Sequence, residues 1–261
     1  MHDLADLAVH LEDVVMTYGR GAKQINAVDH ASFKIRQGEV VALIGPSGCG
    51  KSTTLRMVAN LLRPTSGSVT VRARTPQANG RLRFDEVAMM FQQPALLDWR
   101  TVEGNVELPL EALGIRGAEA KRRVRSVLEL VGLDGFATRR PYELSGGMQQ
   151  RVAMARVLVV EPRLLLLDEP FGALDAITRD KLCLELAALC SARKMSALLV
   201  THSISEAIFL ADRVLVMSQR PGRILTEVDI PMQRPRDVDD RTSEAGRALE
   251  NTLLKMLVGA D

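Results

Sequence analysis

The chain has 261 residues, of which 46% are hydrophobic and 25% are charged, and its formal net charge is +2. This length supports one large domain or two small ones with a sizeable core. The small net charge gives no argument for binding to nucleic acid or anionic lipid. No segment approaches the roughly 18 consecutive apolar residues that would span a bilayer. The first residues also lack the basic flank and apolar run of a secretory signal.

The N-terminal part of the chain is predicted to contain strands over residues 9–18 and 26–36, followed by a short buried strand. The segment Val40–Ile44 is apolar and rich in β-branched residues, which favours a strand inside a core. Residues 51–62 are predicted to form a helix. The glycine-rich segment between this strand and this helix is therefore a turn.

That turn reads Gly45-Pro46-Ser47-Gly48-Cys49-Gly50-Lys51-Ser52-Thr53. Its three glycines let the backbone bend tightly and bring its N–H groups close to phosphate oxygens. Lys51 can reach the β- and γ-phosphates of a nucleotide, and the Ser52 hydroxyl can take a place on Mg²⁺. The helix that follows directs its positive end at the same point. A strand before and a helix after favour a phosphate-binding loop over an ordinary glycine-rich turn.

Two further strands are predicted over residues 67–73 and 87–91, and the pattern becomes helical between about residues 94 and 155. In residues 118–131, apolar side chains recur at helical spacing and basic side chains occupy the other side. We interpret the basic stretch 121–125 as a solvated helix face.

Residues 164–167 are four leucines, which predict a buried strand that delivers Asp168 and Glu169 at its carboxyl end. Ligands bind at this end of the strands in open α/β sheets. Asp168 suits the coordination of Mg²⁺, directly or through water. Glu169 suits the orientation or deprotonation of an attacking water.

The rest of the chain continues the alternation of helices and strands, which predicts a mainly parallel sheet with crossover helices. Ser203 and Glu206 have the spacing of a capping box at the start of a helix, and residues 232–240 look like a linker. A last amphipathic helix, which contains Leu249 and Leu253, is predicted to pack on its own domain. The expected elements are helices over 176–193 and 203–211 and strands over 197–200, 214–217 and 223–230.

The three cysteines, Cys49, Cys183 and Cys190, show no metal-ligand spacing. An odd number of cysteines fits reduced thiols in a cytosolic protein. Cys183 and Cys190 lie on one apolar face of a predicted helix, and we expect them in the core.

A second motif reads Leu144-Ser145-Gly146-Gly147-Met148-Gln149-Gln150. Its serine and glycines open a helix and so offer a hydroxyl, N–H groups and a helix N-terminus to an anion. Together with the phosphate-binding loop and the LLLLDEP segment (164–170), this motif resembles the ATP-binding subunit of ABC transporters. The resemblance implies an α/β fold of the P-loop NTPase (RecA-like) type, with a mainly parallel sheet, an antiparallel β subdomain and an inserted α-helical subdomain. It implies an ATPase domain over residues 7–236, with the helical subdomain at about 94–155, and a C-terminal helical tail over 237–261.

The resemblance also implies roles for individual residues in one subunit. Glu169, His202 and Gln92 match the catalytic glutamate, the switch histidine and the switch-loop glutamine, although Gln93 is an alternative to Gln92. Tyr18 matches the residue that stacks on adenine, or is an ordinary strand residue. The residues implied to bind ATP are Tyr18, Gly45, Pro46, Ser47, Gly48, Cys49, Gly50, Lys51, Ser52 and Thr53, and those implied to hold Mg²⁺ are Ser52, Gln92 and Asp168.

Other residues are implied to act between two subunits. In ABC transporters the serine–glycine motif closes over the ATP of the opposing subunit, which here assigns Ser145, Gly146, Gly147 and Gln149 to the partner's nucleotide. Asp175 would lie at the dimer interface. The resemblance therefore implies a homodimer that ATP closes and hydrolysis releases.

The remaining partners implied by the resemblance are transmembrane permease subunits and, indirectly, a periplasmic or extracellular solute-binding protein, with no nucleic acid. The subunit would lie on the cytoplasmic face of the bacterial inner membrane. Trp99, the only tryptophan, would mark an exposed contact patch for the permease, or pack into its own subdomain.

Segments beyond the catalytic motifs resemble the bacterial importer subfamily for nitrate, sulfonate, taurine and thiamine-precursor-type solutes. These segments are residues 91–99, 105–110 and 217–224. The function implied is an ATP-binding and hydrolysing subunit that energises import of a small solute. The alternatives are a soluble ABC-type mechanochemical ATPase that does not act in transport, and an exporter subunit.

Overall fold

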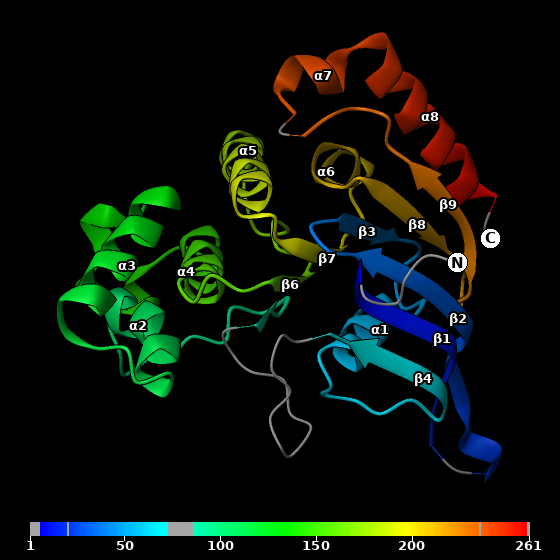
Figure 1. Ribbon diagram of the computed structural model, residues 1–261, viewed down its shortest axis with the longest axis horizontal. Coiled ribbons are helices and arrows are strands. Elements are labelled where there is room, and N and C mark those ends of the chain that lie inside the picture. Colours follow the sequence, from blue (N-terminus) through cyan, green and yellow to red (C-terminus); the bar gives the residue numbers. More distant parts are fainter. Residues whose placement is uncertain (1–5, 20, 73–85, 235, 260–261) are drawn as a thin grey trace.

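The computed structural model describes residues 6–19, 21–72, 86–234 and 236–259. Six strands form its larger sheet: β3 (Val40–Ile44), β5 (Val87–Met90), β6 (Leu164–Asp168), β7 (Ser196–Val200), β8 (Arg213–Met217) and β9 (Ile224–Asp229). Their order is β5-β6-β7-β3-β8-β9 (Figure 1). The first five run parallel and β9 pairs antiparallel with β8. The prediction of a mainly parallel sheet is confirmed.

The central strands are apolar throughout because both faces of the sheet are covered. In β3, Val40, Ala42 and Ile44 enter one core, while Val41 and Leu43 enter a second core on the opposite face. A strand with only one buried face would alternate apolar and polar residues. The continuous apolar run of β3 is therefore explained by its central place in the sheet.

A three-stranded antiparallel sheet covers one face of the larger sheet, together with the first helix (Figure 1). It consists of β1 (Leu7–Tyr18), β2 (Ile25–Arg36) and β4 (Ser66–Val71) in the order β2-β1-β4, with the short helix η2 (Gly21–Lys23) between β1 and β2. Residue 73, at the end of the strand predicted over residues 67–73, lies outside the described residues. The helix α1 (Lys51–Val58) is shorter than the predicted 51–62, because Asn60 adopts φ +56° and Leu61 N–H bonds to the Arg56 carbonyl.

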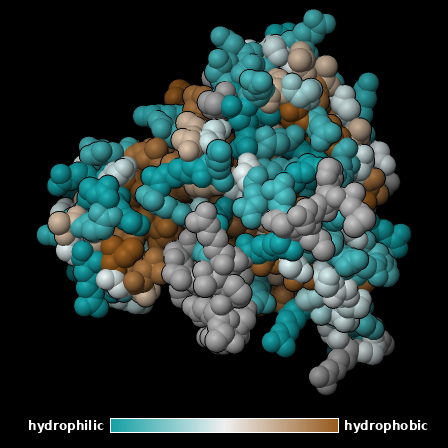
Figure 2. Space-filling view, viewed as in Figure 1, coloured by the Kyte–Doolittle hydropathy of each residue, from teal (hydrophilic) through white to brown (hydrophobic). Residues whose placement is uncertain are grey.

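Three helices form a separate group beside the β5 edge of the sheet (Figure 1). They are α2 (Val102–Ala112), α3 (Gly117–Leu130) and α4 (Gly146–Leu158), with the short helices η3 (Asp134–Phe136) and η4 (Pro141–Glu143) between α3 and α4. In α3, Val124 and Leu128 are buried whereas Arg122 and Arg125 are exposed, so the predicted solvated basic face is confirmed. Figure 2 shows hydrophobic side chains gathered over this helical region.

The other face of the larger sheet is covered by α5 (Ala176–Arg193), α6 (Ile204–Leu210), α7 (Val238–Thr242) and α8 (Glu244–Val258). Cys183 and Cys190 are buried core residues, as expected, and burial raises the pKa of both thiols. Leu253 of α8 is fully buried against the same core, so this last helix packs on its own domain. Among the described helices, none is long and apolar enough to cross a bilayer.

The predicted capping box at α6 is only half formed. The Ser203 hydroxyl accepts a hydrogen bond from the Glu206 N–H, but the Glu206 carboxylate does not return to the Ser203 backbone. It accepts instead from the Thr201 hydroxyl at 2.6 Å, and the Thr201 oxygen accepts from the Ser203 N–H. Glu206 is drawn inward because it is buried beside Thr201 and Arg179.

The prediction of a linker over residues 232–240 is wrong, because a buried arginine anchors this segment and the segment contains the start of α7. Arg236 is 2% exposed, and its burial lowers the pKa of its guanidinium to about 10. That guanidinium donates to the carbonyls of Ile208, Phe209 and Ala211 at the end of α6. It also donates to the carbonyls of Ile230 and Met232. Residue 235 lies outside the described residues.

Candidate functional site

The phosphate-binding loop connects β3 to α1, and its glycines are required by the surrounding backbone. A Cβ atom at Gly45 would lie 2.8 Å from the Met217 carbonyl oxygen, and one at Gly50 would lie 2.6 Å from that of Ala27. Gly48 and Gly50 also adopt φ +74° and +107°, a region that glycine populates without strain. The loop is therefore fixed between β2 and the end of β8.

A cavity of about 530 Å³ opens beside this loop. Seven of the residues implied to bind ATP line it, and they include Tyr18, Ser47, Lys51 and Thr53. The Tyr18 hydroxyl lies 3.4 Å from the Thr53 hydroxyl, which places an aromatic ring beside the start of α1. The lining is Tyr18, Ile25, Ala27, Ser47, Gly48, Gly50, Lys51, Ser52, Thr53, Gln92, Glu169 and Arg220.

Three residues of the loop do not line this cavity. The carbonyls of Gly45 and Pro46 each accept a hydrogen bond of 2.8 Å from the Lys51 ammonium. Cys49 is 1% exposed and its sulfur lies beneath the loop, 3.8 Å from the same ammonium. These residues hold Lys51 and shape the loop, while their neighbours face the cavity.

Asp168 ends β6 directly beneath the start of α1. Its Oδ1 accepts a hydrogen bond of 2.8 Å from the Ser52 hydroxyl. Burial raises the pKa of Asp168 above its ordinary value, because desolvation outweighs the opposing effect of the Ser52 hydrogen bond. The protein thus keeps a carboxyl group in a dry position beside the phosphate-binding loop.

The carboxylate of Glu169 is contacted by side chains that follow the two neighbouring strands. Its Oε2 accepts a hydrogen bond of 3.1 Å from the Gln92 amide, and its Oε1 lies 3.4 Å from Nδ1 of His202. Gln92 follows β5, Glu169 follows β6 and His202 follows β7, so neighbouring parallel strands bring the three together. Gln92, rather than the alternative Gln93, lines the cavity. The backbone of Glu169 has φ +48°, a conformation that is uncommon away from glycine and concentrates at functional sites.

The donors present fit a magnesium ion held partly by its substrate. Ser52 Oγ and Asp168 Oδ1 are hard oxygen donors 2.8 Å apart, and the Gln92 amide lies on the neighbouring Glu169. Mg²⁺ is bound in nucleotide sites by one or two protein oxygens together with phosphates and water. No group of three or more His, Cys, Asp or Glu residues is placed to hold a metal within the described ranges, and a magnesium ion bound through phosphates does not need one.

The serine–glycine motif lies at the start of α4, away from the cavity of its own chain. Ser145 caps the helix by accepting a hydrogen bond from the Met148 N–H, and Ser145 and Gly146 are exposed. Gly147 packs against the carbonyl of Ala173, where a Cβ atom would lie at 3.1 Å. None of these residues belongs to the lining of the cavity. Their exposed hydroxyl and helix N-terminus face outward, where another molecule can reach them.

Two other residues implied to act between subunits are held by their own chain. The Gln149 amide donates to the carbonyls of Pro141 and Leu144 at 3.0 and 3.4 Å. Asp175 caps α5 by accepting from the Thr178 N–H, and this hydrogen bond lowers the pKa of its carboxyl. Asp175 stands beside the loop against which Gly147 packs, so both motifs share one surface.

Sequence reasoning missed Arg220, which lines the nucleotide-sized cavity from the loop after β8. Its segment was noticed only for its resemblance to a subfamily. No residue spacing marks a lone arginine in a hairpin loop as part of a site formed 170 residues earlier in the chain, and only the pairing of β3 with β8 brings it there.

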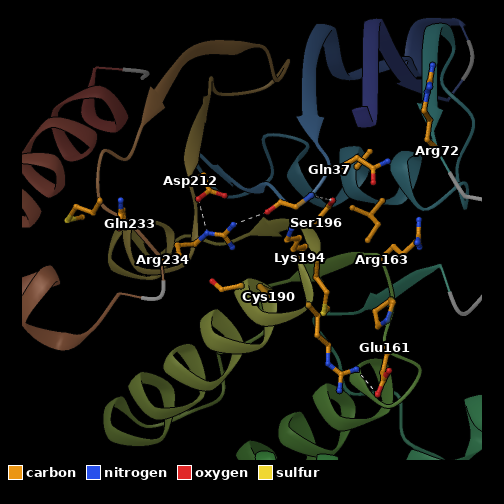
Figure 3. Close-up of a pocket in the computed structure, with 18 residues that line it drawn as sticks. Gln37, Arg72, Glu161, Arg163, Cys190, Lys194, Ser196, Asp212, Gln233 and Arg234 are labelled. Carbon is orange, nitrogen blue, oxygen red and sulfur yellow. Dashed lines mark hydrogen bonds and ion pairs between the residues drawn. The ribbon is translucent and has the colours of Figure 1, made fainter. Parts of the chain in front are cut away.

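Another cavity, of about 1190 Å³, lies at the amino-terminal ends of the parallel strands, at the opposite end from the nucleotide site (Figure 3). Two of its four arginines form ion pairs, Arg193 with Glu161 and Arg234 with Asp212. Its basic residues also gather near the C-terminal ends of α4 and α5, where cations complement the helix dipoles. Helix C-termini disfavour anions, so the charges here are explained by the fold.

Comparison with known proteins identifies the family to which this constellation belongs. Residues 28–172 match the ABC transporter family. The chain is 46% identical over 232 residues to the "Aliphatic sulfonates import ATP-binding protein SsuB 1" of Mesorhizobium japonicum, covering 89% of this chain and 83% of that protein. It is 43% identical over 217 residues to the "Taurine import ATP-binding protein TauB" of Rhizobium johnstonii, covering 83% and 80%.

Solved structures agree with this relationship. A dimeric, post-hydrolysis state of the ATP-binding cassette MJ0796 bound to ADP and Pi superimposes with a TM-score of 0.77 at 34% identity, covering 86% of this chain and all of that one. The predicted α/β fold, with its parallel sheet, antiparallel sheet and helical region, is therefore confirmed. The chain belongs to the ABC transporter family and is an ATP-hydrolysing, ATP-binding subunit.

Proposed function

We propose that the protein powers the import of a small anionic solute, and that ATP binds in the cavity beside the phosphate-binding loop. The observation that carries the proposal is the convergence of Gln92 and His202 on Glu169 at the mouth of that cavity. A nucleotide-binding loop alone would describe many proteins. A carboxylate held between a glutamine and a histidine, facing the same cavity, adds the means to direct a water at the terminal phosphate.

The residues of this chain divide the work of hydrolysis. The loop N–H groups and Lys51 hold the phosphates. Glu169 orients a water and accepts its proton as the water oxygen bonds to the γ-phosphorus and the bond to the β–γ bridging oxygen breaks, giving ADP and phosphate. Gln92 and His202 fix the position of that carboxylate and contact the water and the γ-phosphate. Ser52, Asp168 and Gln92 would hold Mg²⁺, which would supply positive charge to offset that of the phosphates.

The complete site in this proposal requires a second copy of the chain. Ser145, Gly146 and Gly147 expose a helix N-terminus that does not reach the cavity of its own subunit. In a symmetric dimer, this N-terminus would close over the γ-phosphate bound by the partner, with Gln149 and Asp175 beside it. Closure would bury two ATP molecules, and their hydrolysis would release the halves. The dimeric neighbours of known structure support this arrangement.

An apolar groove of about 440 Å³ offers a docking place for the permease. It lies between α1, β5 and α2, and its walls include Met89, Leu108 and Pro109. Leu61 and Phe91, which also line it, are 60% and 40% exposed. We propose that a short amphipathic helix of a transmembrane subunit occupies this groove. Phe91 directly precedes Gln92, so a helix seated here would touch the segment that carries a catalytic residue.

The location and the solute follow from this partner. The subunit would sit on the cytoplasmic face of the bacterial inner membrane, and a separate solute-binding protein would deliver the solute to the permease. The relatives named for sulfonates, taurine and nitrate support a small organic or inorganic solute that carries an anionic group. We further propose that residues 7–236 form the ATPase domain, with its helical subdomain at about 94–155, and that residues 237–261 form a C-terminal helical tail.

The test is uptake by proteoliposomes that enclose ATP and carry the permease together with the full chain, with the solute-binding protein added outside. We expect uptake of taurine or an aliphatic sulfonate with the wild-type chain and none with Lys51→Ala. Leu61→Glu should release the subunit from the permease while its basal ATPase activity remains, because it places a charge in the apolar groove. Leu225→Glu is a matched control, since Leu225 on β9 is also at least half exposed and lies outside the groove. Copurification with ribosomes or nucleic acid, or ATP-driven movement of solute outward, would contradict the proposal.

A further inference from the structure

The loop between β8 and β9 packs against the phosphate-binding loop and places the guanidinium of Arg220 beside the cavity. Gly222 in this loop exchanges backbone hydrogen bonds with β2, donating to the Ala27 carbonyl at 3.1 Å and accepting from the Asp29 N–H at 2.9 Å. A side chain at Gly222 would collide with the Cys49 carbonyl of the phosphate-binding loop. The hairpin loop, β2 and the phosphate-binding loop are therefore packed together without space between them.

The internal hydrogen bonds of the hairpin loop keep its shape. The Ser218 hydroxyl donates to the carbonyls of Gln219 and Pro221 and accepts from the Arg223 N–H at 2.9 Å. The Arg223 guanidinium donates to Asp29 at 2.7 Å, and this hydrogen bond lowers the pKa of the Asp29 carboxyl. Arg223 thus anchors the loop to β2 with its charge neutralised by a carboxylate.

Arg220, three residues earlier, bonds to a backbone carbonyl instead of a carboxylate. Its Nε and Nη2 donate to the carbonyl oxygen of Gly48 at 3.1 and 2.9 Å, at the apex of the phosphate-binding loop. It lines the cavity that also contains Lys51, Ser52 and Tyr18. In the part of the chain that the structure describes, no carboxylate forms an ion pair with it. The guanidinium has more N–H donors than one carbonyl oxygen uses, so a charged group with donors to spare borders the site.

We propose that Arg220 is a nucleotide-binding residue whose guanidinium contacts the anionic phosphate chain of ATP in its own subunit. This inference rests on the proposed placement of ATP in the cavity. The hydrogen bonds to Gly48 hold the guanidinium in place, so that little side-chain freedom is lost when the anion binds. The planar fork of an arginine is suited to phosphate oxygens, and charge-assisted hydrogen bonds are the stronger kind.

The alternative is that Arg220 only braces the apex of the loop through the Gly48 carbonyl. The two roles differ in what they need from the side chain. Bracing needs a hydrogen-bond donor, whereas a phosphate contact needs the positive charge. The charge contact is also weakened by salt, because the site is open to solvent.

The experiment measures binding of a ribose-labelled, non-hydrolysable ATP analogue to the full chain with Mg²⁺, and its displacement by inorganic tripolyphosphate. The variants are Arg220→Gln, which keeps a donor without the charge, and Arg220→Lys, which keeps the charge. Lys51→Ala tests whether the analogue binds in this cavity at all. Arg125→Gln is the charge-matched control, because Arg125 is an exposed residue of α3 outside the cavity.

We expect Arg220→Gln to raise the Kd of both the analogue and tripolyphosphate about 5- to 20-fold at low salt, the size of a charge-assisted hydrogen bond at an exposed site. Arg220→Lys should retain most of the affinity, and Arg125→Gln should bind as the wild type does. The difference in affinity between Arg220→Gln and the wild type should become smaller at about 0.5 M salt, where the Debye length falls to a few ångströms.

Three results would overturn the inference and leave the proposed function standing. The first is wild-type affinity in Arg220→Gln while Lys51→Ala binds weakly. The second is a loss of affinity in Arg220→Gln that is the same at both salt concentrations, and the third is a loss of affinity for the analogue but not for tripolyphosphate. Wild-type binding by both Arg220→Gln and Lys51→Ala would instead remove ATP from the cavity, and with it the proposed function of this site.

Discussion

The Ser52 hydroxyl donates a hydrogen bond of 2.8 Å to Asp168, and this bond connects the phosphate-binding loop to the carboxyl end of β6. The two residues are 116 positions apart in the chain. Asp168 is 2% exposed, and burial raises its pKa. The protein therefore retains, in its core, a carboxyl group whose charged form is poorly solvated. Such a group suits cation binding and is unfavourable for the stability of the fold alone.

Replacing Asp168 with asparagine should stabilise the protein and abolish its ATPase activity. Asparagine keeps an oxygen that accepts from Ser52 but carries no charge to desolvate. Folding raises the pKa of Asp168 above 3.8, so the native state binds its proton more readily than the unfolded state does. The free-energy cost of burying the charged carboxylate is therefore at its maximum above the pKa of the folded state. This cost disappears as the pH falls below 3.8.

Urea unfolding without nucleotide or Mg²⁺, measured from pH 4 to pH 8, checks this prediction. The advantage of Asp168→Asn in the free energy of unfolding should be largest at neutral pH and should narrow toward the acidic end. Asp134→Asn, in the short helix η3 of the helical region, is a control that should show no such trend. An asparagine variant that is less stable than the wild type at pH 7 would show that the charge of Asp168 is already compensated.

Replacing Glu169 with glutamine should preserve ATP binding and nearly stop hydrolysis. Glutamine keeps the shape and can still bond to Gln92, but it cannot accept a proton from water. Loss of a general base lowers turnover by about 10²- to 10⁴-fold. The dimer should then persist with ATP bound, which size-exclusion chromatography with light scattering can detect. The control is Glu161→Gln, at an exposed glutamate beyond the amino-terminal end of β6, and it should hydrolyse ATP normally. Wild-type turnover in Glu169→Gln would remove Glu169 from this role.

Replacing Ser145 with arginine should block hydrolysis without weakening the binding of ATP to a single subunit. The bulky cation would occupy the exposed helix N-terminus that the partner's nucleotide is proposed to meet. Ser145→Ala is the comparison variant, since it also removes the hydroxyl and the helix cap, at about 1 kcal/mol of stability, but adds no bulk, so it should lower the hydrolysis rate less than Ser145→Arg does. The measurement is the ATPase rate as a function of protein concentration. An unchanged rate in Ser145→Arg would mean that one subunit suffices.

The sequence predicted the fold and singled out most of the residues that line the candidate cavity, because both depend on short continuous motifs. The loop from Gly45 to Thr53 specifies its own geometry through glycines, and four leucines specify the strand before Asp168 and Glu169. Gln92 and His202 were assigned through the resemblance to ABC transporters, and the order of the parallel strands explains why both lie beside Glu169.

The residues that were missed act through contacts that no local pattern encodes. Arg236 reads as part of a charged linker, yet it is buried against the carbonyls at the end of α6. Glu206 has the spacing of a capping box, but tertiary burial directs it to Thr201. Arg220 reaches the site only because β8 lies next to β3 in the sheet. For isolated charged residues, the partner is decided by tertiary packing, which a local sequence pattern does not reveal.

The exposed Trp99 provides a test of coupling to the membrane subunits. It is 71% exposed, which decides against the alternative that it packs into its own subdomain. Asn105, which is fully buried, holds its loop by accepting from the Leu97 N–H and donating to the carbonyls of Leu97, Arg100 and Thr101. An exposed tryptophan on a rigidly held loop is suited to contact another protein.

We expect Trp99→Ala to keep its thermal stability and basal ATPase activity but to lose about 10-fold or more in permease-stimulated hydrolysis, as expected for an aromatic anchor of an interface. Asn105→Ala should instead destabilise the protein by about 2–4 kcal/mol, because buried backbone groups lose their partners. Thermal unfolding and ATPase assays with and without the permease distinguish the two. If Trp99→Ala unfolded like Asn105→Ala, the tryptophan would be a structural residue. If stimulation by the permease survived in a stable Trp99→Ala, the contact would lie elsewhere, with the apolar groove between α1, β5 and α2 as the remaining candidate.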